Sequence, residues 1–150
     1  MKPEIIQLPK ILDPRGNLTF IENGAQVPFE IKRAYWIYDV PGGEERHGHA
    51  FRTSAELIVA LSGSFDVVVD CGNGEERIHL DRSFYGLYVP PMTWRRIDNF
   101  STNSVALVLS STNYNEGDYI RDYEMWHREL TSGIAFQPNL KVSRNWDYDF

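Results

Sequence analysis

Residues 55–70 read AELIVALSGSFDVVVD. Two apolar runs, Ala55–Leu61 and Phe65–Asp70, flank the turn residues Ser62-Gly63-Ser64. Apolar runs of this length between turn signals are typical of buried strands, and glycine supplies the positive φ that a tight turn requires. The stretch therefore predicts two consecutive strands joined by a short turn.

The same alternation of short runs and turns continues along the chain in both directions. Glycine or proline marks turns at 13–16, 41–43, 72–74 and 90–91. The pattern predicts an all-β sandwich or barrel, and 150 residues suit one domain with one core. The further predicted strands are 17–22, 31–38, 77–80, 87–89 and 105–110.

A helix is predicted only near the C-terminus. Residues 117–130 read GDYIRDYEMWHREL and place apolar side chains three and four residues apart. We expect this short helix to cap or extend the barrel, so that one domain spans 1–131. Residues 132–150 end in acidic and aromatic side chains, and we expect this tail to pack on its own barrel or on a partner subunit.

Composition limits the partners. The net charge is −6 and the pI is about 5.2, which argues against nucleic acid or an anionic membrane as the main partner. The sequence has no signal peptide and no apolar stretch long enough to cross a bilayer, so we expect a cytoplasmic protein. Its one cysteine, Cys71, has no internal partner for a disulfide. A small anionic ligand remains possible if the fold gathers arginines.

The segment 43–56 (GEERHGHAFRTSAE) carries the most informative spacing. It resembles the first signature of the cupin superfamily, in which a glycine, a His-x-His pair, a glutamate and a second glycine follow at set intervals. Residues 90–99 resemble the second signature. The resemblance implies a cupin jelly-roll β-barrel. The matching positions are Gly43, His49, Phe51, Glu56 and Gly63 in the first signature, and Pro90, Met92, Arg95 and Asn99 in the second.

Metal-binding cupins hold their ion at the positions of His49, Phe51, Glu56 and Arg95. A phenyl ring has no lone pair and a guanidinium is a permanent cation, so two of the four positions cannot bind a divalent metal. We therefore expect no metal and no other cofactor. An alternative stays open in which His47 and His49, on one strand face, hold a metal with Glu56.

Five segments resemble a narrower group within this superfamily, the dTDP-4-keto-6-deoxyglucose 3,4-ketoisomerases, also called WxcM-like or FdtA/QdtA-type isomerases. The likeness runs from about residue 4 to about residue 130. It implies a metal-independent homodimer that acts on a dTDP-linked keto-deoxysugar in deoxysugar biosynthesis, such as that for the O-antigen of lipopolysaccharide. The segments are DPRGNLTFIE (13–22), RAYWIYDVPGGEER (33–46), ALSGSFDVVVD (60–70), GLYVPPMTW (86–94) and YIRDY (119–123).

The family segment Arg-Gly-Gly-His-Ala-His is matched by residues 46–51, RHGHAF. His49 stands at the first family histidine, and Phe51 replaces the second. The family's active-site tyrosine is matched by Tyr35. Arg15 and Arg95 lie where the family varies among Arg, Tyr and His, positions that are thought to influence the configuration at C4; the choice between a galacto and a gluco product stays open.

Moving a carbonyl from C4 to C3 through an enediol needs a group that removes and returns a proton near neutral pH, which suits an imidazole. We expect His49 to be this base, with Tyr35 or Arg95 stabilising the enediolate oxygen and His47 contributing to proton transfer. Arginine binds a diphosphate best. The expected substrate-binding residues are Arg15, Arg33, Arg46 and Arg121.

Two alternatives to an isomerase remain. The loss of the second histidine to Phe51 would also fit a weakened cupin that binds a nucleotide sugar or supports a partner enzyme. The metal-dependent cupin with His47, His49 and Glu56 would belong to a different reaction class.

Overall fold

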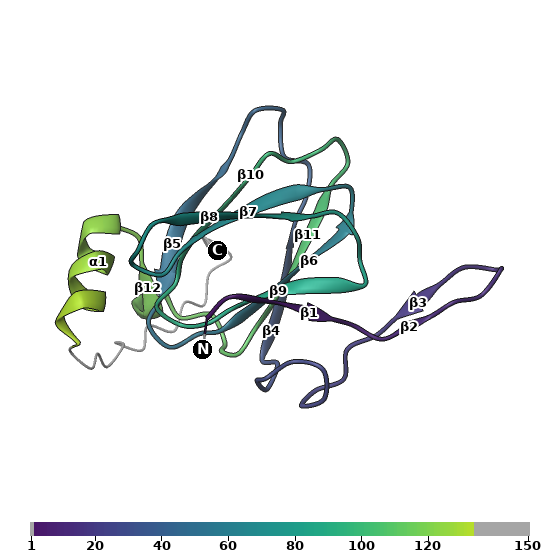
Figure 1. Ribbon diagram of the computed structural model, residues 1–150, viewed down its shortest axis with the longest axis horizontal. Coiled ribbons are helices and arrows are strands. Elements are labelled where there is room, and N and C mark those ends of the chain that lie inside the picture. The colour runs from purple at the N-terminus through teal and green to yellow at the C-terminus, as the bar shows by residue number, and fades with distance from the viewer. Residues whose placement is uncertain (1, 134–150) are drawn as a thin grey trace.

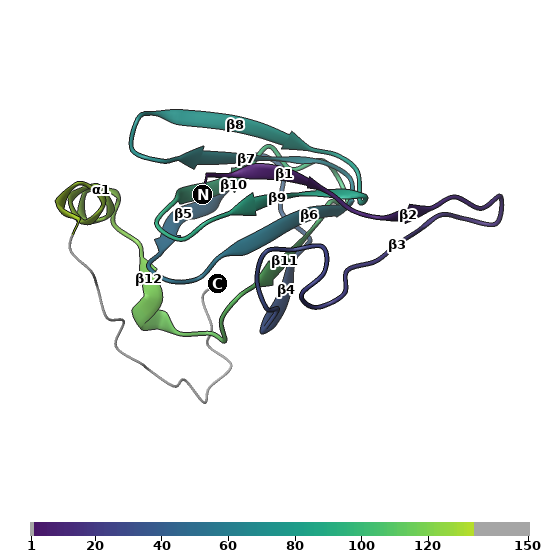
Figure 2. The ribbon, with the colours of Figure 1, turned by 60° about the horizontal axis from the view of Figure 1, so that its bottom comes forward.

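The computed structural model describes residues 2–133, in which two five-stranded antiparallel sheets face each other (Figures 1 and 2). The predicted all-β jelly-roll barrel with a short C-terminal helix is confirmed. In spatial order, the first sheet contains β1 (Glu4–Gln7), β9 (Tyr85–Val89), β6 (Glu56–Ser62), β11 (Val105–Ser110) and β4 (Arg33–Ile37). The second contains β12 (Tyr119–Ile120), β5 (Arg46–Phe51), β10 (Trp94–Asp98), β7 (Phe65–Asp70) and β8 (Glu75–Leu80).

Two short strands, β2 (Lys10–Ile11) and β3 (Leu18–Thr19), pair only with each other. They form a hairpin that projects from one end of the barrel, whereas the helix α1 (Tyr123–Ser132) lies at the opposite end (Figures 1 and 2). A turn of 3-10 helix, η1 (Glu116–Asp118), precedes β12. No helix within residues 2–133 is long and apolar enough to cross a membrane.

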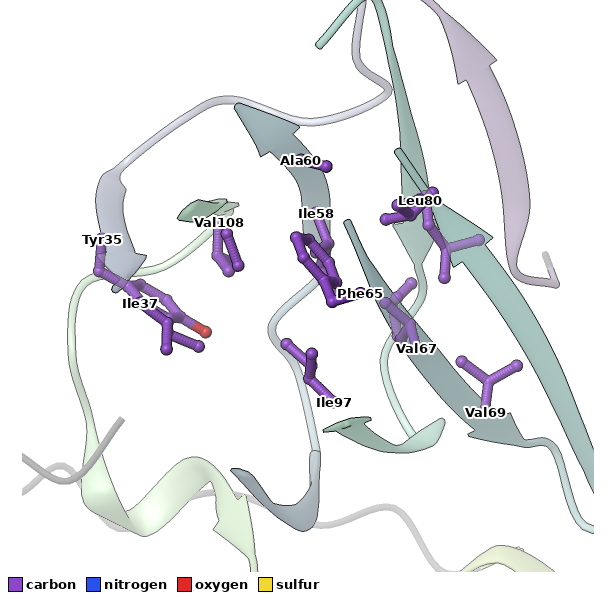
Figure 3. Packing of buried hydrophobic residues seen from close by; sticks show 13 residues of the cluster. Tyr35, Ile37, Ile58, Ala60, Phe65, Val67, Val69, Leu80, Ile97 and Val108 are labelled. Carbon is purple, nitrogen blue, oxygen red and sulfur yellow. The ribbon is translucent and has the colours of Figure 1, made fainter. Parts of the chain in front are cut away.

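The core fills the space between the two sheets, as Figure 3 shows. Alternate residues of each strand face inward, because successive side chains of a strand point to opposite sides. Val67 and Val69 of β7 therefore meet Ile58 and Ala60 of β6 across the layer, with Phe65 fully buried among them. These β-branched and aromatic side chains fit a pleated, buried surface, which explains why both strands were recognisable in the sequence.

The sequence and the structure differ most around residues 117–122. The predicted helix over 117–130 begins only at Tyr123, because the carboxylate of Asp122 caps it by accepting a hydrogen bond from the backbone N–H of Met125. Residues before the cap form η1 and β12 instead. The strands β1, β2 and β10 were not predicted, and β5 was assumed only as the strand whose face His47 and His49 would share. The expected packing of the tail 132–150 falls, beyond residue 133, outside the described residues.

The helix is fastened to the second sheet by Trp126, whose side chain is fully buried. It packs with Ala50 of β5 and Ile120 of β12, and its indole Nε1 donates a hydrogen bond of 2.9 Å to the carbonyl oxygen of Met92. Arg52, which follows β5, donates to the Glu129 carboxylate of α1 at 2.8 and 3.1 Å. The helix thus holds the end of the sheet where β5 and β12 lie side by side.

Candidate active site

The candidate site is built around β5, which lies between β10 and β12. His49 pairs with Arg95 of β10, but the next pair is Arg46 with Ile97, so β5 contains one extra residue between its two partners. Such a bulge breaks the two-residue period of the strand. Because Arg95 and Ile97 both point inward from β10, the bulge turns Arg46 and His49 toward the same side.

Gly48 lies inside this bulge, and its lack of a side chain is required there. A Cβ at this position would come within 2.6 Å of Nε1 of Trp94 on the neighbouring strand. The approach is too close for any larger residue without a shift of the indole. The glycine therefore lets β5 and β10 run close together at the point where His49 and Arg95 meet.

A buried ion pair lies beside His49. Arg95 donates two hydrogen bonds to Oε1 of Glu56, from Nε at 2.9 Å and from Nη2 at 2.8 Å. Tyr35 donates to Oε2 of the same carboxylate and accepts a 2.9 Å hydrogen bond from Nη2 of Arg95. Burial, together with the charge of Glu56, raises the pKa of Tyr35 well above its usual value. Tyr35 therefore stays protonated, and Glu56 holds it and Arg95 in place.

His49 is the group in this cluster with an available lone pair. Its side chain is 2% exposed, and its Nε2 has no hydrogen-bond partner among the described residues. The ring forms a hydrogen bond with the backbone of His47, which must involve the other nitrogen, Nδ1. A proton on Nδ1, donated to the carbonyl oxygen, leaves Nε2 as the basic nitrogen.

The surroundings keep this imidazole neutral. Burial is the largest cause that lowers the pKa of His49 well below its ordinary value, and the positive charges of Arg95, Arg121 and Arg46 lower it further. The hydrogen bond to the His47 backbone acts in the opposite direction but does not outweigh them. At neutral pH, His49 therefore presents a lone pair rather than a proton at Nε2.

Two aromatic residues form the wall next to this nitrogen. The ring centroid of His49 lies 4.9 Å from that of Phe51 and 5.0 Å from that of Tyr119, and the rings of Phe51 and Tyr119 meet edge to face at 4.5 Å. Tyr119 is 6% exposed, and its hydroxyl has no hydrogen-bond partner among the described residues. The wall thus contains two buried polar atoms, His49 Nε2 and Tyr119 Oη, that no described group satisfies.

Two of the expected substrate-binding arginines approach this wall. Arg121 lies over the ring of Tyr119, with its guanidinium carbon 4.2 Å from the centroid, and Glu116 accepts two of its hydrogen bonds at 2.8 and 3.0 Å. Arg46 shares the inward side of β5 with His49. Both lower the pKa of His49, which shows that their positive charges act on the same site.

Arg33 approaches from the other sheet. Its Nη2 donates to Oγ of Ser110 at 3.3 Å, and its guanidinium carbon lies 5.5 Å from the ring centroid of Tyr35 and 5.6 Å from that of Tyr114. Its charge also acts on Tyr119, where it opposes the pKa increase that burial causes. Arginines from β4, β5 and the segment after β12 therefore surround one small region.

Asp118 fixes the backbone that carries Tyr119. Its carboxylate is 2% exposed and accepts four hydrogen bonds: from the backbone N–H of Thr53 at 2.8 Å, from the Thr53 hydroxyl at 2.8 Å, from the backbone N–H of Ser54 at 3.0 Å and from the Ser54 hydroxyl at 2.6 Å. The backbone N–H of Arg52 donates to the Asp118 carbonyl, and Nη1 of Arg52 donates to the carbonyl oxygen of Tyr119. The aromatic wall is thus rigidly attached to the end of β5.

Comparison with known proteins agrees with this geometry. The family model described as FdtA, WxcM-like, C-terminal matches residues 1–131. A TDP-4-oxo-6-deoxy-α-D-glucose 3,4-oxoisomerase from Aneurinibacillus thermoaerophilus is 43% identical over 130 residues, which cover 87% of this chain and 94% of the relative. The chain belongs to the WxcM-like family.

Solved structures of ketoisomerases share the fold. A 3,4-ketoisomerase from Helicobacter canadensis superposes with a TM-score of 0.84 at 37% identity, covering 87% of this chain and 98% of the other. The sugar 3,4-ketoisomerase from Thermoanaerobacterium thermosaccharolyticum, solved with TDP, gives a TM-score of 0.85 at 33% identity, covering 88% and 96%. A variant of that second enzyme has been solved with TDP-4-keto-6-deoxyglucose.

In this WxcM-like chain, the structure gathers most of the residues selected from the sequence. His49, Tyr35 and Arg95 lie together, and Arg33, Arg46 and Arg121 surround them. Two residues missing from the sequence-based set are Glu56, considered there only as a metal ligand, and Tyr119, considered there as part of a helix and of the family-like segment YIRDY but without a role. The cupin spacing already pointed to Glu56 as a residue near His49. That Tyr119 lies beside His49 could be found only from the fold.

The expectation that residues 47, 49 and 51 share one strand face is wrong for His47. The bulge between Arg46 and His49 interrupts the alternation, and the side chain of His47 is exposed. His47 therefore contributes its backbone, which orients the His49 ring, rather than an imidazole beside it. The side-chain arrangement that a metal ion would need at His47, His49 and Glu56 is also missing, because the Glu56 carboxylate already accepts hydrogen bonds from Arg95 and Tyr35. No group of three or more His, Cys, Asp or Glu residues within 2–133 is arranged to hold a metal ion.

Arg15 is the other expected site residue that the single chain does not bring to His49. It lies in the turn between β2 and β3, with its side chain 91% exposed and paired to Asp13 at 2.8 Å. The hairpin carries it away from the barrel (Figure 1). A contact with substrate would require the hairpin to reach the site of another copy.

Replacing Asp118 with alanine should destabilise the fold. Asp118→Ala removes an acceptor of four hydrogen bonds and leaves buried donors at Thr53 and Ser54, so we expect the free energy of unfolding to fall by about 3 kcal/mol. Urea denaturation followed by circular dichroism measures this change. Glu30→Ala, which removes an exposed carboxylate near Lys32, is the control and should have little effect. Equal denaturation midpoints for the two variants would contradict the role given to Asp118.

Proposed function

We propose that this chain isomerises a TDP-linked 4-keto-6-deoxyhexose by moving the carbonyl group from C4 to C3 through an enediol. The observation that carries the proposal is the buried, neutral imidazole of His49, whose Nε2 has no hydrogen-bond partner among the described residues and is surrounded by arginines. The activities of the relatives support the same reaction. We also propose that the chain works in the cytoplasm, in making deoxysugars such as those of O-antigens.

His49 would move the proton between the two carbons. Nε2 removes the proton from C3, the electrons form a C3=C4 double bond, and the C4 carbonyl oxygen becomes negatively charged. The imidazolium then returns a proton to C4, and the proton of the C3 hydroxyl passes to the C4 oxygen, so that C3 becomes the new carbonyl and C4 carries the hydroxyl. C3 and C4 are bonded neighbours, so one nitrogen can serve both without moving far.

Arg95 would stabilise the negative charge that develops on the sugar oxygen, and Tyr35, which donates its own proton to Glu56, would hold the Arg95 guanidinium in place. Glu56 prevents Arg95 from being an uncompensated buried charge and fixes the directions of the guanidinium and the phenol. Fixed donors in a buried site stabilise an oxyanion strongly, because nothing has to reorganise as the charge appears. Arg95 also keeps the resting His49 neutral. Its positive charge would thus have two effects, because it keeps the base unprotonated before the reaction and stabilises the anionic intermediate during it.

The arginines around the aromatic wall would hold the diphosphate. Arg46 and Arg121 lie close enough to act on the charge of His49, and Arg33 acts on Tyr119. Planar guanidinium groups bind phosphate oxygens through paired hydrogen bonds, which fixes the orientation of the sugar as well as its affinity. The carboxylate of Glu116 orients Arg121 toward this region.

We further propose that two copies of the chain form a homodimer through the β2–β3 hairpin. Within residues 2–133, this hairpin pairs with no other strand, and it leaves Ile11, Leu12 and Leu18 exposed. Exposed apolar side chains on a projecting hairpin favour burial against another surface. β4 is an edge strand of the first sheet and carries exposed Trp36, so each copy offers both a projecting hairpin and an unpaired edge.

An apolar groove at the base of the hairpin extends this surface. It has a volume of about 390 Å³ and lies over the outer side of the first sheet. A second copy that covers this groove would also bring Arg15 of one copy close to the active site of the other. Its lining includes Phe20, Ile21, Leu61, Leu107 and Leu109.

His49→Asn should abolish most of the isomerisation without unfolding the chain. The variant removes the proposed base but keeps a polar side chain of moderate size, so we expect turnover to fall at least about 100-fold. NMR of TDP-4-keto-6-deoxyglucose incubated with each protein measures the carbonyl migration. His79→Asn on β8, paired with Asp66 at the surface, is the control and should retain wild-type turnover. Binding of TDP by the wild-type chain without any turnover would contradict the isomerase and favour a binding protein.

The dependence of the rate on pH should reveal the lowered pKa of His49. Because the folded site disfavours the imidazolium, the neutral base persists as the pH falls below the ordinary histidine value of 6.5, and activity is lost only when the pH falls through the lowered pKa. The acid limb of kcat/KM should therefore lie below pH 6.5. NMR titration of the His49 ring in the free chain should give the same transition, and a midpoint above 6.5 would be inconsistent with the proposed site.

Leu18→Glu should convert the dimer into monomers. A carboxylate on the apolar face of the hairpin would have to be buried without a partner in the dimer, which is costly. Size-exclusion chromatography with light scattering measures the mass of each species. Met125→Glu, which places the same charge on an exposed apolar position of α1, should leave the dimer intact. A wild-type chain that is monomeric at micromolar concentration would refute the assembly.

A further inference from the structure

Two buried polar atoms without hydrogen-bond partners among residues 2–133 belong to the same aromatic wall. They are Nε2 of His49 and the hydroxyl of Tyr119, on rings whose centroids are 5.0 Å apart. An unsatisfied buried polar group costs about 1–3 kcal/mol, so such groups are rare unless they have a function. The proposed reaction accounts for His49 but leaves the Tyr119 hydroxyl unexplained.

The position of Tyr119 is tightly fixed. It pairs with Phe51 in the ladder between β12 and β5, and Arg52 donates a 3.1 Å hydrogen bond to its carbonyl oxygen. The preceding residue, Asp118, is held by four hydrogen bonds, and Arg121 lies over the ring at 4.2 Å. A loosely packed tyrosine could turn to find a partner, whereas this ring is held with its hydroxyl unsatisfied. Rigid support of this kind is typical of residues that meet a ligand.

The other tyrosines nearby already use their hydroxyl groups. Tyr35 donates to Glu56 and accepts from Arg95, and Tyr114 donates to Glu116 at 2.6 Å. Phe51, the third ring of the wall, carries no polar atom. Of the three tyrosines, Tyr119 is therefore the one whose hydroxyl proton is available beside His49.

We propose that Tyr119 is a second catalytic residue, whose hydroxyl transfers the proton between the two sugar oxygens while His49 transfers the proton between the two carbons. This inference rests on the isomerase function proposed above. The phenol donates its proton to the C4 oxygen as that oxygen gains negative charge. The phenolate oxygen then takes the proton of the C3 hydroxyl as the C3 carbonyl forms, so Tyr119 ends the cycle in its starting state.

The electrostatic surroundings suit this sequence of steps. Burial is the largest cause that raises the pKa of Tyr119, and the charge of Glu56 raises it further, so the resting residue is a neutral donor. Arg33, Arg95 and Arg121 act in the opposite direction and favour a short-lived phenolate. The site therefore keeps the proton on the tyrosine before the reaction and limits the cost of its brief removal.

Tyr119→Phe tests the proposal, because it removes one oxygen and keeps the ring that packs on His49 and Phe51. We expect kcat with TDP-4-keto-6-deoxyglucose to fall at least about 100-fold, as is usual for the loss of a general acid, while KM and the Kd for TDP change less than about twofold. Tyr85→Phe on β9 is the matched control, since it likewise removes one tyrosine hydroxyl, here one that donates to the exposed Asp81; it should retain wild-type kcat.

Two further measurements separate a chemical role from a structural one. Tyr119→Phe combined with Phe51→His places an imidazole in contact with the same wall, and it should recover at least about tenfold of the lost kcat. Replacing Tyr119 with 3,5-difluorotyrosine makes the phenol more acidic and should move the alkaline limb of the pH–rate profile to lower pH. An unmoved limb would overturn the proposal even if Tyr119→Phe failed to fold.

The outcomes for this residue and for the proposed function are distinct. A wild-type chain that turns over substrate, with Tyr119→Phe within about threefold of its kcat, would overturn the role of Tyr119 alone. A wild-type chain that does not turn over the substrate at all would overturn both. A 100-fold loss in Tyr119→Phe with unchanged TDP affinity supports both.

Discussion

The ion pair between Glu56 and Arg95 joins the two sheets of the barrel. Glu56 begins β6 in one sheet and Arg95 lies on β10 in the other, and both are at most 2% exposed. Burying either charge alone would cost several kcal/mol, so each residue requires the other. Tyr35, from a third strand, completes the set of hydrogen bonds. The three side chains therefore form a cluster without net charge at the inner end of the barrel. Within this cluster, the positively charged guanidinium of Arg95 is the part that faces His49.

This cluster changes what a histidine at the cupin position can do. In a metal-binding cupin, the lone pair of the imidazole is donated to the ion and cannot accept a proton. Here Arg95 places a permanent positive charge near His49 without using that lone pair. The charge keeps the base unprotonated at rest and is available to an anionic intermediate. With Arg95 and Phe51 at two of the four ligand positions, the same spacing that holds a metal in other cupins would here serve the proposed acid–base chemistry.

Much of the fold could be predicted from local patterns because strands such as β7 and β11 are continuous runs of β-branched and apolar residues. The local pattern did not reveal β5, since its sequence RHGHAF has no such run and its bulge interrupts the alternation; a strand was assumed there only as the element whose face His47 and His49 would share. The same bulge explains why Arg46, rather than His47, shares the side of His49. The isolated Gly48 is the one local sign of the bulge, and the structure adds the close approach of the Trp94 indole from the neighbouring strand.

Tyr119 shows a different limit of sequence reasoning. The segment YIRDY has apolar spacing that fits a helix, and in a helix Tyr119 would simply face the core. Its actual position depends on Asp118 binding Thr53 and Ser54, which lie more than sixty residues earlier in the chain. Such long-range polar contacts override local preference and leave no periodic signal. The cupin spacing located His49 and Glu56 because that spacing is itself set by strand geometry.

The facial geometry of the sugar connects these residues to the product. In a gluco-configured pyranose, the protons on C3 and C4 lie on opposite faces of the ring. A single base that removes the C3 proton and returns a proton to C4 from the same side therefore produces the galacto configuration. A gluco product requires a proton donor on the other face. With His49 acting at carbon and Tyr119 acting at oxygen, both on one wall, the configuration at C4 reports whether the opposite face of the site contributes a donor of its own.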